Sequence, residues 1–481
     1  MADCHSGNGV AAPALALAQV WQAAGLPAQA LERVTLTGAE PALASSFAVG
    51  TAAQATIAAA ALAATEVGRA RNGLIQRVSI DMRHAALDCR THFMVDGRTP
   101  SMWDALAGLY ACGDGGRVRI HTNFEHHRDG VLRLLDLPAG NSTSRAEVAQ
   151  ALQGWHALEF EDAADAAGLC VAALRTFEQW DAHPQGQAVA RQPLLDIQCI
   201  GDAPARELPP LAGGRRPLEG LRVLDLTRIL AGPVGGRALA AYGADVLLVN
   251  APHLPNIEAI ADTSRGKLSA HADLRTEDGR AAFIRVLRGA HIIVQGYRPG
   301  GLRALGFGPD DIARLCSGAV VVSLSAYGPT GPWSGRRGFD SLVQTATGFN
   351  AAEAQAFGSG PARSLPAQIF DHACGYLIAL GAQAALLRQL HEGGSWHVQL
   401  SLAATSHWLR GLGRVEQGFD APPPDLSGLM ETTPSGFGEL TALRHAAVLS
   451  ATPVAWTRPS MPPGSHALDW PDTAPGSQPG Q

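Results

Sequence analysis

The feature that most constrains the fold is an alternation, between residues 218 and 410, of short apolar runs with helical patterns. The apolar runs are compact and rich in Val, Ile and Leu; they are Leu221–Leu226, Ala244–Val249, His291–Gln295 and Ala319–Ser325. Buried strands have this composition, and amphipathic helices between successive strands are typical of βαβ units. The alternation therefore predicts a parallel sheet, which binds ligands at the carboxyl ends of its strands.

The rest of the chain divides by composition. A Pro- and Gly-rich linker at 201–217 separates the predicted lobe, 218–420, from residues 101–200. In 101–200 a Gly-rich turn, a strand at Arg117–His121 and helical patterns predict a smaller α+β domain. Residues 421–481 are Pro-rich and are predicted to form an extended C-terminal tail. The expected fold class is therefore α/β, a Rossmann-like parallel-sheet lobe with a second, smaller α+β domain.

A weak internal repeat relates residues 51–82 to residues 371–402 by a shift of 320. Both segments show a helix, then a Gly, then a strand. The identical positions are Ala53, Ala59, Ala64, Gly73 and Val78, which match Ala373, Ala379, Ala384, Gly393 and Val398. In an Ala-rich chain it is the shared pattern, more than the identities, that indicates a repeat.

Charge and cysteine content narrow the classes of function. The formal net charge is −6, so no basic surplus exists to neutralise nucleic-acid phosphates. The seven cysteines are scattered without a CxxC or Cys/His spacing, which predicts a reducing compartment and neither a disulfide framework nor a metal site. The first residues do not resemble a signal peptide, and the most apolar run, Ala52–Ala64, is too short to span a bilayer. We expect a cytoplasmic protein with no membrane or nucleic-acid partner.

Three loops that follow predicted strands carry residues suited to an anionic ligand. The turn Asp225–Pro233 offers backbone N–H groups at a helix start, and Tyr297–Leu302 offers an aromatic face and a guanidinium. The Gly-rich loop Ala326–Leu342 contains the pair Arg336 and Arg337. Each loop also has a plainer interpretation, as an ordinary turn with a solvated arginine.

Asp371 stands before a long apolar helical pattern, so it is either a helix N-cap or a nucleophile next to N–H groups that would stabilise an oxyanion. For Asp340 the favoured interpretation is a cap on the helix that follows it. The adjacent His126 and His127 point to different faces of a helix, which favours surface or core histidines over a metal site.

Five collinear segments between residues 217 and 405 resemble the family III CoA-transferases, the CaiB–BaiF group. They include PLEGLRVLDLTRILAGP, SRGKLSAHADLRTEDGR, VQGYRPGGL, SLSAYGPTGPWSGRRGFDSL and FDHACGYLIALG. Residues 110–189 resemble the family's small domain, which in the family follows the large lobe and here precedes it. With the repeat, this order indicates that residues 1–100 are a partial, degenerate copy of the large lobe, with Thr51 where the second copy has Asp371.

The resemblance implies an enzyme that exchanges CoA between an acyl-CoA and a carboxylic acid through a covalent aspartyl intermediate on Asp371. Coenzyme A would be a substrate, no metal would be needed, and the chain could form a homodimer. The implied CoA contacts are Arg228, Ile229, Leu230, Lys267, Gly296, Tyr297, Arg298 and Arg337. The family's charged strand end is replaced here by Leu248 and Asn250.

Two alternatives remain open at this point. An acyl-CoA racemase or epimerase of the same superfamily would need a His in a Gly-His-Asp motif, where this chain has Phe339. A non-catalytic CoA-binding pseudoenzyme is the other alternative, and binding of acyl-CoA without exchange would distinguish it.

Overall fold

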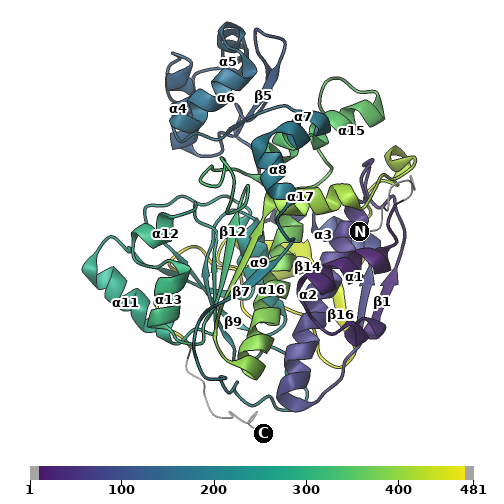
Figure 1. Cartoon of the computed structure of the whole chain (residues 1–481), viewed down its shortest axis with the longest axis vertical. Coiled ribbons are helices and arrows are strands. Elements are labelled where there is room, and N and C mark those ends of the chain that lie inside the picture. The colour runs from purple at the N-terminus through teal and green to yellow at the C-terminus, as the bar shows by residue number, and fades with distance from the viewer. Residues whose placement is uncertain (1–9, 472–481) are drawn as a thin grey trace.

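A seven-stranded sheet forms the centre of the larger part of the molecule in the computed structural model, which describes residues 10–471 (Figure 1). Its strand order is β10-β9-β8-β11-β12-β13-β7. The strands are β7 (Asp196–Gly201), β8 (Arg222–Leu226), β9 (Asp245–Asn250), β10 (Lys267–His271), β11 (Ile292–Gln295), β12 (Val320–Ser325) and β13 (Ser395–Ser401). All neighbours are parallel except β13 and β7. The α/β class predicted from the alternation is confirmed.

Helices cover both faces of this sheet because alternate side chains of each strand point to opposite sides. Val223, Ile292 and Val320 belong to the core shared with α9 and α16, whereas Leu224 and Ile293 belong to the core shared with α11 and α13. The helices of the lobe are α9 (Ala231–Ala241), α10 (Ile260–Thr263), α11 (Glu277–Arg288), α12 (Gly301–Ala304), α13 (Pro309–Leu315), α14 (Asp340–Ala346), α15 (Phe349–Phe357), α16 (Ile369–Glu392) and α17 (Leu402–Gly411).

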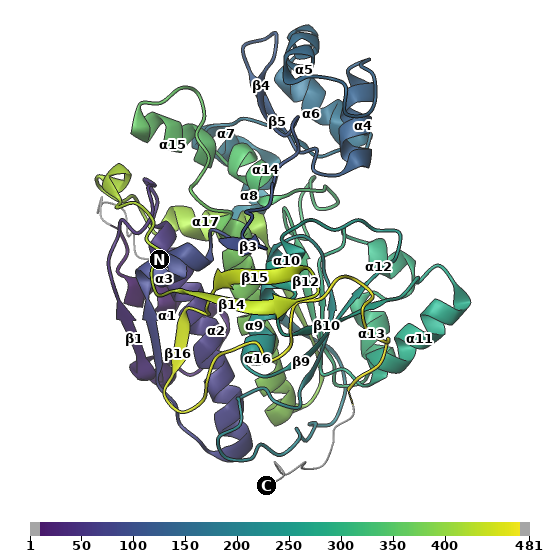
Figure 2. The same ribbon diagram turned by 180° about the vertical axis from the view of Figure 1, so that it is seen from behind.

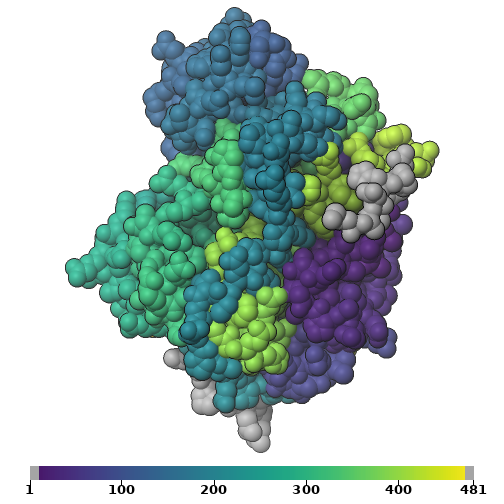
Figure 3. Space-filling view, viewed as in Figure 1, coloured from purple at the N-terminus to yellow at the C-terminus, as the bar shows by residue number. Residues whose placement is uncertain are grey.

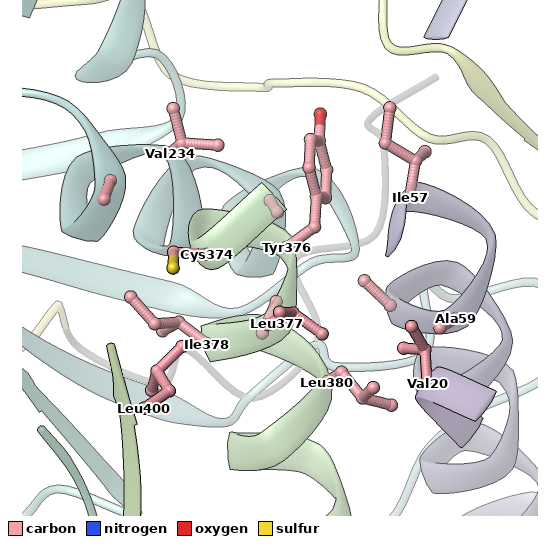
Figure 4. Packing of buried hydrophobic residues seen from close by; sticks show 14 of the residues in the cluster. Val20, Ile57, Ala59, Val234, Cys374, Tyr376, Leu377, Ile378, Leu380 and Leu400 are labelled. Carbon is pink, nitrogen blue, oxygen red and sulfur yellow. The ribbon is translucent and has the colours of Figure 1, made fainter. Parts of the chain in front are cut away.

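Helix α16 is the central packing element of the molecule. It lies between α9 and α2 (Val49–Asn72), and Figure 4 shows its Leu380 beside Val20 of α1 (Pro13–Ala23). It is long and apolar enough to cross a membrane, yet the apolar window is entirely buried inside the protein. Its approach to α9 requires Gly375, because a Cβ there would lie 2.6 Å from Val234 Cγ1.

The internal repeat extends to the boundaries of the elements. α2 and α16 both have 24 residues, and a shift of 320 superimposes both their first and last residues. The same shift aligns the end of β2 (Val78–Asp81) with the end of β13, and the start of α3 (Met82–Asp88) with the start of α17. The caps correspond too, since Asp81 accepts a hydrogen bond from the His84 amide and Ser401 accepts one from the Ala404 amide.

The smaller domain projects from the upper end of the lobe (Figure 3). Its sheet, β4-β5-β6, is antiparallel and packs against three helices and a short 3-10 turn. These elements are β4 (Gly108–Ala111), β5 (Arg117–Ile120), β6 (Val171–Ala173), α4 (Glu125–Leu134), α5 (Arg145–Ala151), η2 (Leu152–Gly154) and α6 (Ala157–Ala166). The chain returns to the lobe through α7 (Phe177–Ala182) and α8 (Pro184–Ala190).

The segment after residue 420 is not the extended tail that its composition predicted. It forms β14 (Met430–Ser435), β15 (Gly438–Leu443) and β16 (Ala447–Leu449), which cross the back of the molecule in Figure 2. β15 pairs with β3 (Phe93–Val95), and β16 pairs with β2. The remaining described elements are α1 (Pro13–Ala23), η1 (Ala28–Arg33), β1 (Val34–Thr37) and η3 (Gly418–Asp420). The two ends of the chain thus share the sheets β1-β2-β16 and β14-β15-β3.

Candidate active site

The loops after β8 and β11 open a crevice at the carboxyl edge of the sheet. These two strands are neighbours, and the chain leaves β8 toward β9 on one side and β11 toward β12 on the other. Such a switch point leaves an unfilled space between the two loops. A cavity of about 360 Å³ lies there, lined by both loops, by the loop that carries Arg337, and by the start of α16.

Seven of the eight predicted CoA contacts line this cavity, together with Asp371. They are Arg228, Ile229, Leu230, Gly296, Tyr297, Arg298 and Arg337. Lys267 is the exception, and the prediction for it is wrong in position. Its ammonium is fully buried and donates to Asp225 Oδ2 and to the Pro233 carbonyl, each at 2.8 Å. Lys267 therefore joins β8 to the first turn of α9 rather than facing the cavity.

The cavity is rich in positive charge. Within residues 10–471, no carboxylate lies within ion-pair distance of Arg228, Arg298 or Arg337, whereas the neighbouring Arg336 pairs with Asp165 at 3.2 Å. Arg337 donates to the Gly168 carbonyl at 2.8 Å, which ties the Gly-rich loop to the small domain. Because guanidinium groups without carboxylate partners bind phosphates well, this wall suits a phosphorylated ligand.

The turn at the start of α9 is conformationally strained. Ile229 has a φ of 78°, a left-handed conformation that a β-branched residue rarely adopts. Gly232 is the second residue of α9. It has to be a glycine, because a Cβ there would lie 2.4 Å from the Thr227 side chain. The strain is located where the chain bends around the cavity, and Ile229 contributes to its lining.

Asp371 lies within the first turn of α16 and is not its N-cap. The cap residue is Gln368, and the Phe370 and Asp371 amides donate to Asp340 Oδ2 at 2.7 and 3.0 Å. Asp340 thus caps α16 and not its own helix, contrary to the sequence-based prediction. Since these two amides are occupied, they are not free to stabilise an oxyanion.

The two carboxyl groups perturb each other. Burial, and then the neighbouring Asp340, raise the pKa of Asp371 well above its usual value. Burial raises the pKa of Asp340 to about 7, against hydrogen bonds from the Asp371 amide, the Gln344 side chain and the Phe370 amide. Asp340 has these donors to stabilise its negative charge, so the shared proton resides preferentially on Asp371.

A second cavity, of about 480 Å³, lies beyond Asp371. It shares Ile229, Leu230, Phe339 and Asp371 with the first cavity, so the Asp371 carboxyl faces both. Much of its other wall comes from residues 90–123, including Arg119 and His121, which no sequence motif singled out. The His121 ring stacks on Phe339 with 3.8 Å between ring centroids.

The first repeat has no comparable site at Thr51. This side chain is fully buried, and its amide donates to Glu40 Oε1 at 2.6 Å. Glu40 therefore caps α2 much as Asp340 caps α16, although it lies in a different place in the sequence.

Elsewhere in the described residues, no group of three or more His, Cys, Asp or Glu side chains has the arrangement of a metal site.

Comparison with known proteins places this site in a family. Residues 218–428 match the family described as CoA-transferase family III. This match covers the central sheet from β8 to β13 and the start of α16, which carries Asp371. The chain is also 29% identical over 373 residues to an acyl-CoA transferase of Gibberella moniliformis, covering 68% of this chain and 64% of the relative.

Two bacterial relatives match this chain over a shorter length. A probable fatty acyl-CoA transferase of Mycobacterium tuberculosis is 32% identical over 207 residues, which is 40% of this chain and 52% of that protein. The succinate–glutarate CoA-transferase of Agrobacterium fabrum is 32% identical over 206 residues, 39% of this chain and 51% of that protein. The chain therefore spans about half to two thirds of the length of these curated relatives.

Proposed function

We propose that the protein is a CoA-transferase that exchanges CoA between an acyl-CoA and a carboxylic acid, with Asp371 as the nucleophile. The observation that carries the proposal is the position of Asp371 between two cavities. The arginine-lined cavity suits the phosphates of CoA, and the other offers room for the organic acid. A neighbouring hollow of about 660 Å³ shares Arg298 and Arg337 with the first, so a long ligand has space to extend.

The proposed reaction proceeds by acyl transfer to and from one carboxylate. An oxygen of Asp371 attacks the thioester carbon, the C–S bond breaks, and CoA leaves as a thiolate from the resulting mixed anhydride. The thiolate attacks the Asp371 acyl carbon, which forms an aspartyl thioester and releases the first acid as a carboxylate. The acceptor carboxylate then attacks this thioester and releases the thiolate. Attack of the thiolate on the acceptor's acyl carbon forms the new acyl-CoA and frees Asp371.

Two features of the site support these steps. Asp371 is 8% exposed, so water has little access to an anhydride that would otherwise hydrolyse. The raised pKa of Asp371 makes its carboxylate a better nucleophile once it is ionised, because a more basic oxygen binds carbon more strongly. A racemase function is not supported by Phe339, since its ring has no proton to exchange.

Trapping of the aspartyl thioester tests the proposal directly. The protein is incubated with a panel of acyl-CoA esters, quenched with hydroxylamine, digested and analysed by mass spectrometry. We expect a hydroxamate on Asp371 alone and loss of exchange in Asp371→Ala. Asp202→Asn serves as the control, because this carboxylate is exposed and lies outside both cavities. Near-normal exchange by Asp371→Ala would refute the mechanism.

CoA as a substrate without a metal, a cytoplasmic location, a homodimer, and the absence of membrane and nucleic-acid partners stay predictions. Acyl-CoA and carboxylic acids are the small-molecule partners that the proposal requires.

A further inference from the structure

The second cavity has a chemical character of its own. Asp371 lines it together with apolar side chains, among them Met102, Ile257 and Leu365. Two cationic side chains, Arg90 and Arg119, line it as well. Both arginines lie outside residues 218–428, the part of the chain that matches the family.

Neither arginine has a carboxylate partner in the part of the chain that the structure describes. Arg119 donates to two hydroxyl groups, from Nε to Thr345 Oγ1 at 2.9 Å and from Nη2 to Ser364 Oγ at 3.0 Å. Among the described residues, Arg90 has no side-chain hydrogen bond and neither guanidinium lies within ion-pair distance of a carboxylate. Burial lowers the pKa of both groups, so both lie partly out of solvent. Two partly buried cations without an anion favour an anionic ligand.

The arginines are separated from the reacting carboxyl group. The pKa of Asp371 is raised by burial and by Asp340, and no cation offsets these effects. Arg119 acts electrostatically on Asp340, which accepts a hydrogen bond from the Asp371 amide. One cavity thus holds the Asp371 carboxyl group, two guanidinium groups and apolar side chains.

We propose that Arg90 and Arg119 select a dicarboxylic acid, by holding the second carboxylate while the first reacts at Asp371 across an apolar spacer. The inference rests on the proposed function for the role of Asp371. It adds the class of acid that is bound and the two residues that select this class. A guanidinium group binds a carboxylate through two parallel hydrogen bonds of fixed geometry. A monoacid has no second carboxylate to make these bonds, so it should bind less tightly than a diacid.

The test compares matched acids in binding and in exchange. Glutarate and adipate are titrated against butyrate and valerate by calorimetry, and the same acids serve as acceptors with any acyl-CoA donor that reacts. The wild-type protein should bind the diacids roughly 10- to 100-fold more tightly, the factor expected for a hydrogen bond to a charged group. Arg90→Gln and Arg119→Gln should each remove most of this preference by raising KM for the diacids much more than KM for the monoacids.

Arg117→Gln is the matched control, because Arg117 lies on the same strand, β5, but does not line the cavity. It should keep the full preference for diacids. Arg119→Gln also removes bonds to Thr345 and Ser364, so its melting temperature is measured and Arg119→Lys is compared with it. Arg90 makes no such bonds, and Arg90→Gln therefore remains informative if Arg119→Gln unfolds.

The outcomes separate this inference from the proposed function. Equal affinity of the wild-type protein for diacids and monoacids would overturn the selection by arginine, even if exchange proceeds. The same holds if Arg90→Gln and Arg119→Gln lose monoacid and diacid exchange equally. Preferential diacid binding without any exchange would support the selection while refuting the transferase.

Discussion

Replacing Asp371 with Asn should stabilise the protein at alkaline pH while it abolishes exchange. The wild-type side chain is a buried carboxyl group beside a second carboxyl group, Asp340, and both raise the free energy of the folded state when they ionise. Asn has nearly the same shape but cannot ionise. Asp371→Asn should therefore raise the free energy of unfolding, because it removes a buried charge that catalysis requires but that destabilises the folded state.

The sign and size of the effect follow from proton linkage. An acid with a raised pKa holds its proton in the folded state after the unfolded chain has lost it, so the free energy of unfolding falls as pH rises through that interval. For Asp340 the interval runs from 3.8 to about 7. With ~1.4 kcal/mol for each pKa unit, the ionised Asp340 costs on the order of 4 kcal/mol at pH 8, and the raised pKa of Asp371 acts in the same direction.

Thermal unfolding measures the difference. An unfolding entropy of about 2.1 cal/mol/K per residue gives roughly 1 kcal/mol/K for 481 residues, so each kcal/mol that Asp371→Asn adds at pH 8 should raise Tm by about 1 °C. At pH 5 the gain should be clearly smaller, because the loss of stability has accrued over only part of the interval that begins at the unfolded value of 3.8, and it should vanish below that pH. The exposed Asp202→Asn should show no such pH dependence. A gain of equal size at both pH values, or a lower Tm at pH 8, would refute the reasoning.

Four other substitutions probe different parts of the structure. Arg337→Glu should weaken CoA binding about 10-fold or more in a calorimetric titration, because it reverses a charge in the phosphate-suited wall; unchanged affinity would remove this residue from the site. Lys267→Met leaves Asp225 buried without its partner and should lower the free energy of unfolding in urea by about 3–5 kcal/mol, with CoA affinity unchanged in the folded fraction. Thr51→Ala should leave exchange intact, and a tight CoA ester should saturate at one equivalent per chain, whereas two equivalents would indicate a second working site. Gly375→Val should prevent soluble expression by forcing α16 away from α9, unlike Gly411→Ala, whose added Cβ meets no neighbour within 4 Å.

The central sheet could be predicted because most of its strands are short runs of Val, Ile and Leu, which can be recognised in the sequence without knowledge of their neighbours. β8, β9, β11 and β12 each begin within a residue of the predicted positions. β10 was missed, since its sequence KLSAH includes a lysine whose charge is neutralised only by Asp225 on another strand. The strands after residue 420 were missed for a similar reason. β14 reads METTPS, a polar run with a proline, and it becomes a strand only through its pairing with β15.

The candidate site was predictable on one side only. The residues that follow strands β8 and β11 meet at the switch point because parallel strands bring their carboxyl ends to one edge. Arg90, just after α3, and Arg119, on β5 of the smaller domain, line the same cavity as Asp371 only through tertiary packing, which no local pattern records. The cap on α16 illustrates the same limit, because Asp340 is 31 residues from the amide of Asp371 that it accepts from.

The pairing of the two chain ends has a consequence for biosynthesis. When the ribosome has completed α2, the face of this helix that packs on α16 has no partner until α16 emerges some 300 residues later, and β2 waits still longer for β16. At translation speeds of about 5–20 residues per second, the delay for α2 alone is on the order of 15–60 s. During that time an apolar helix and an open strand edge are exposed to other nascent chains. Yield in vivo should therefore depend on chaperone capacity and on growth temperature more than the stability of the finished protein would suggest.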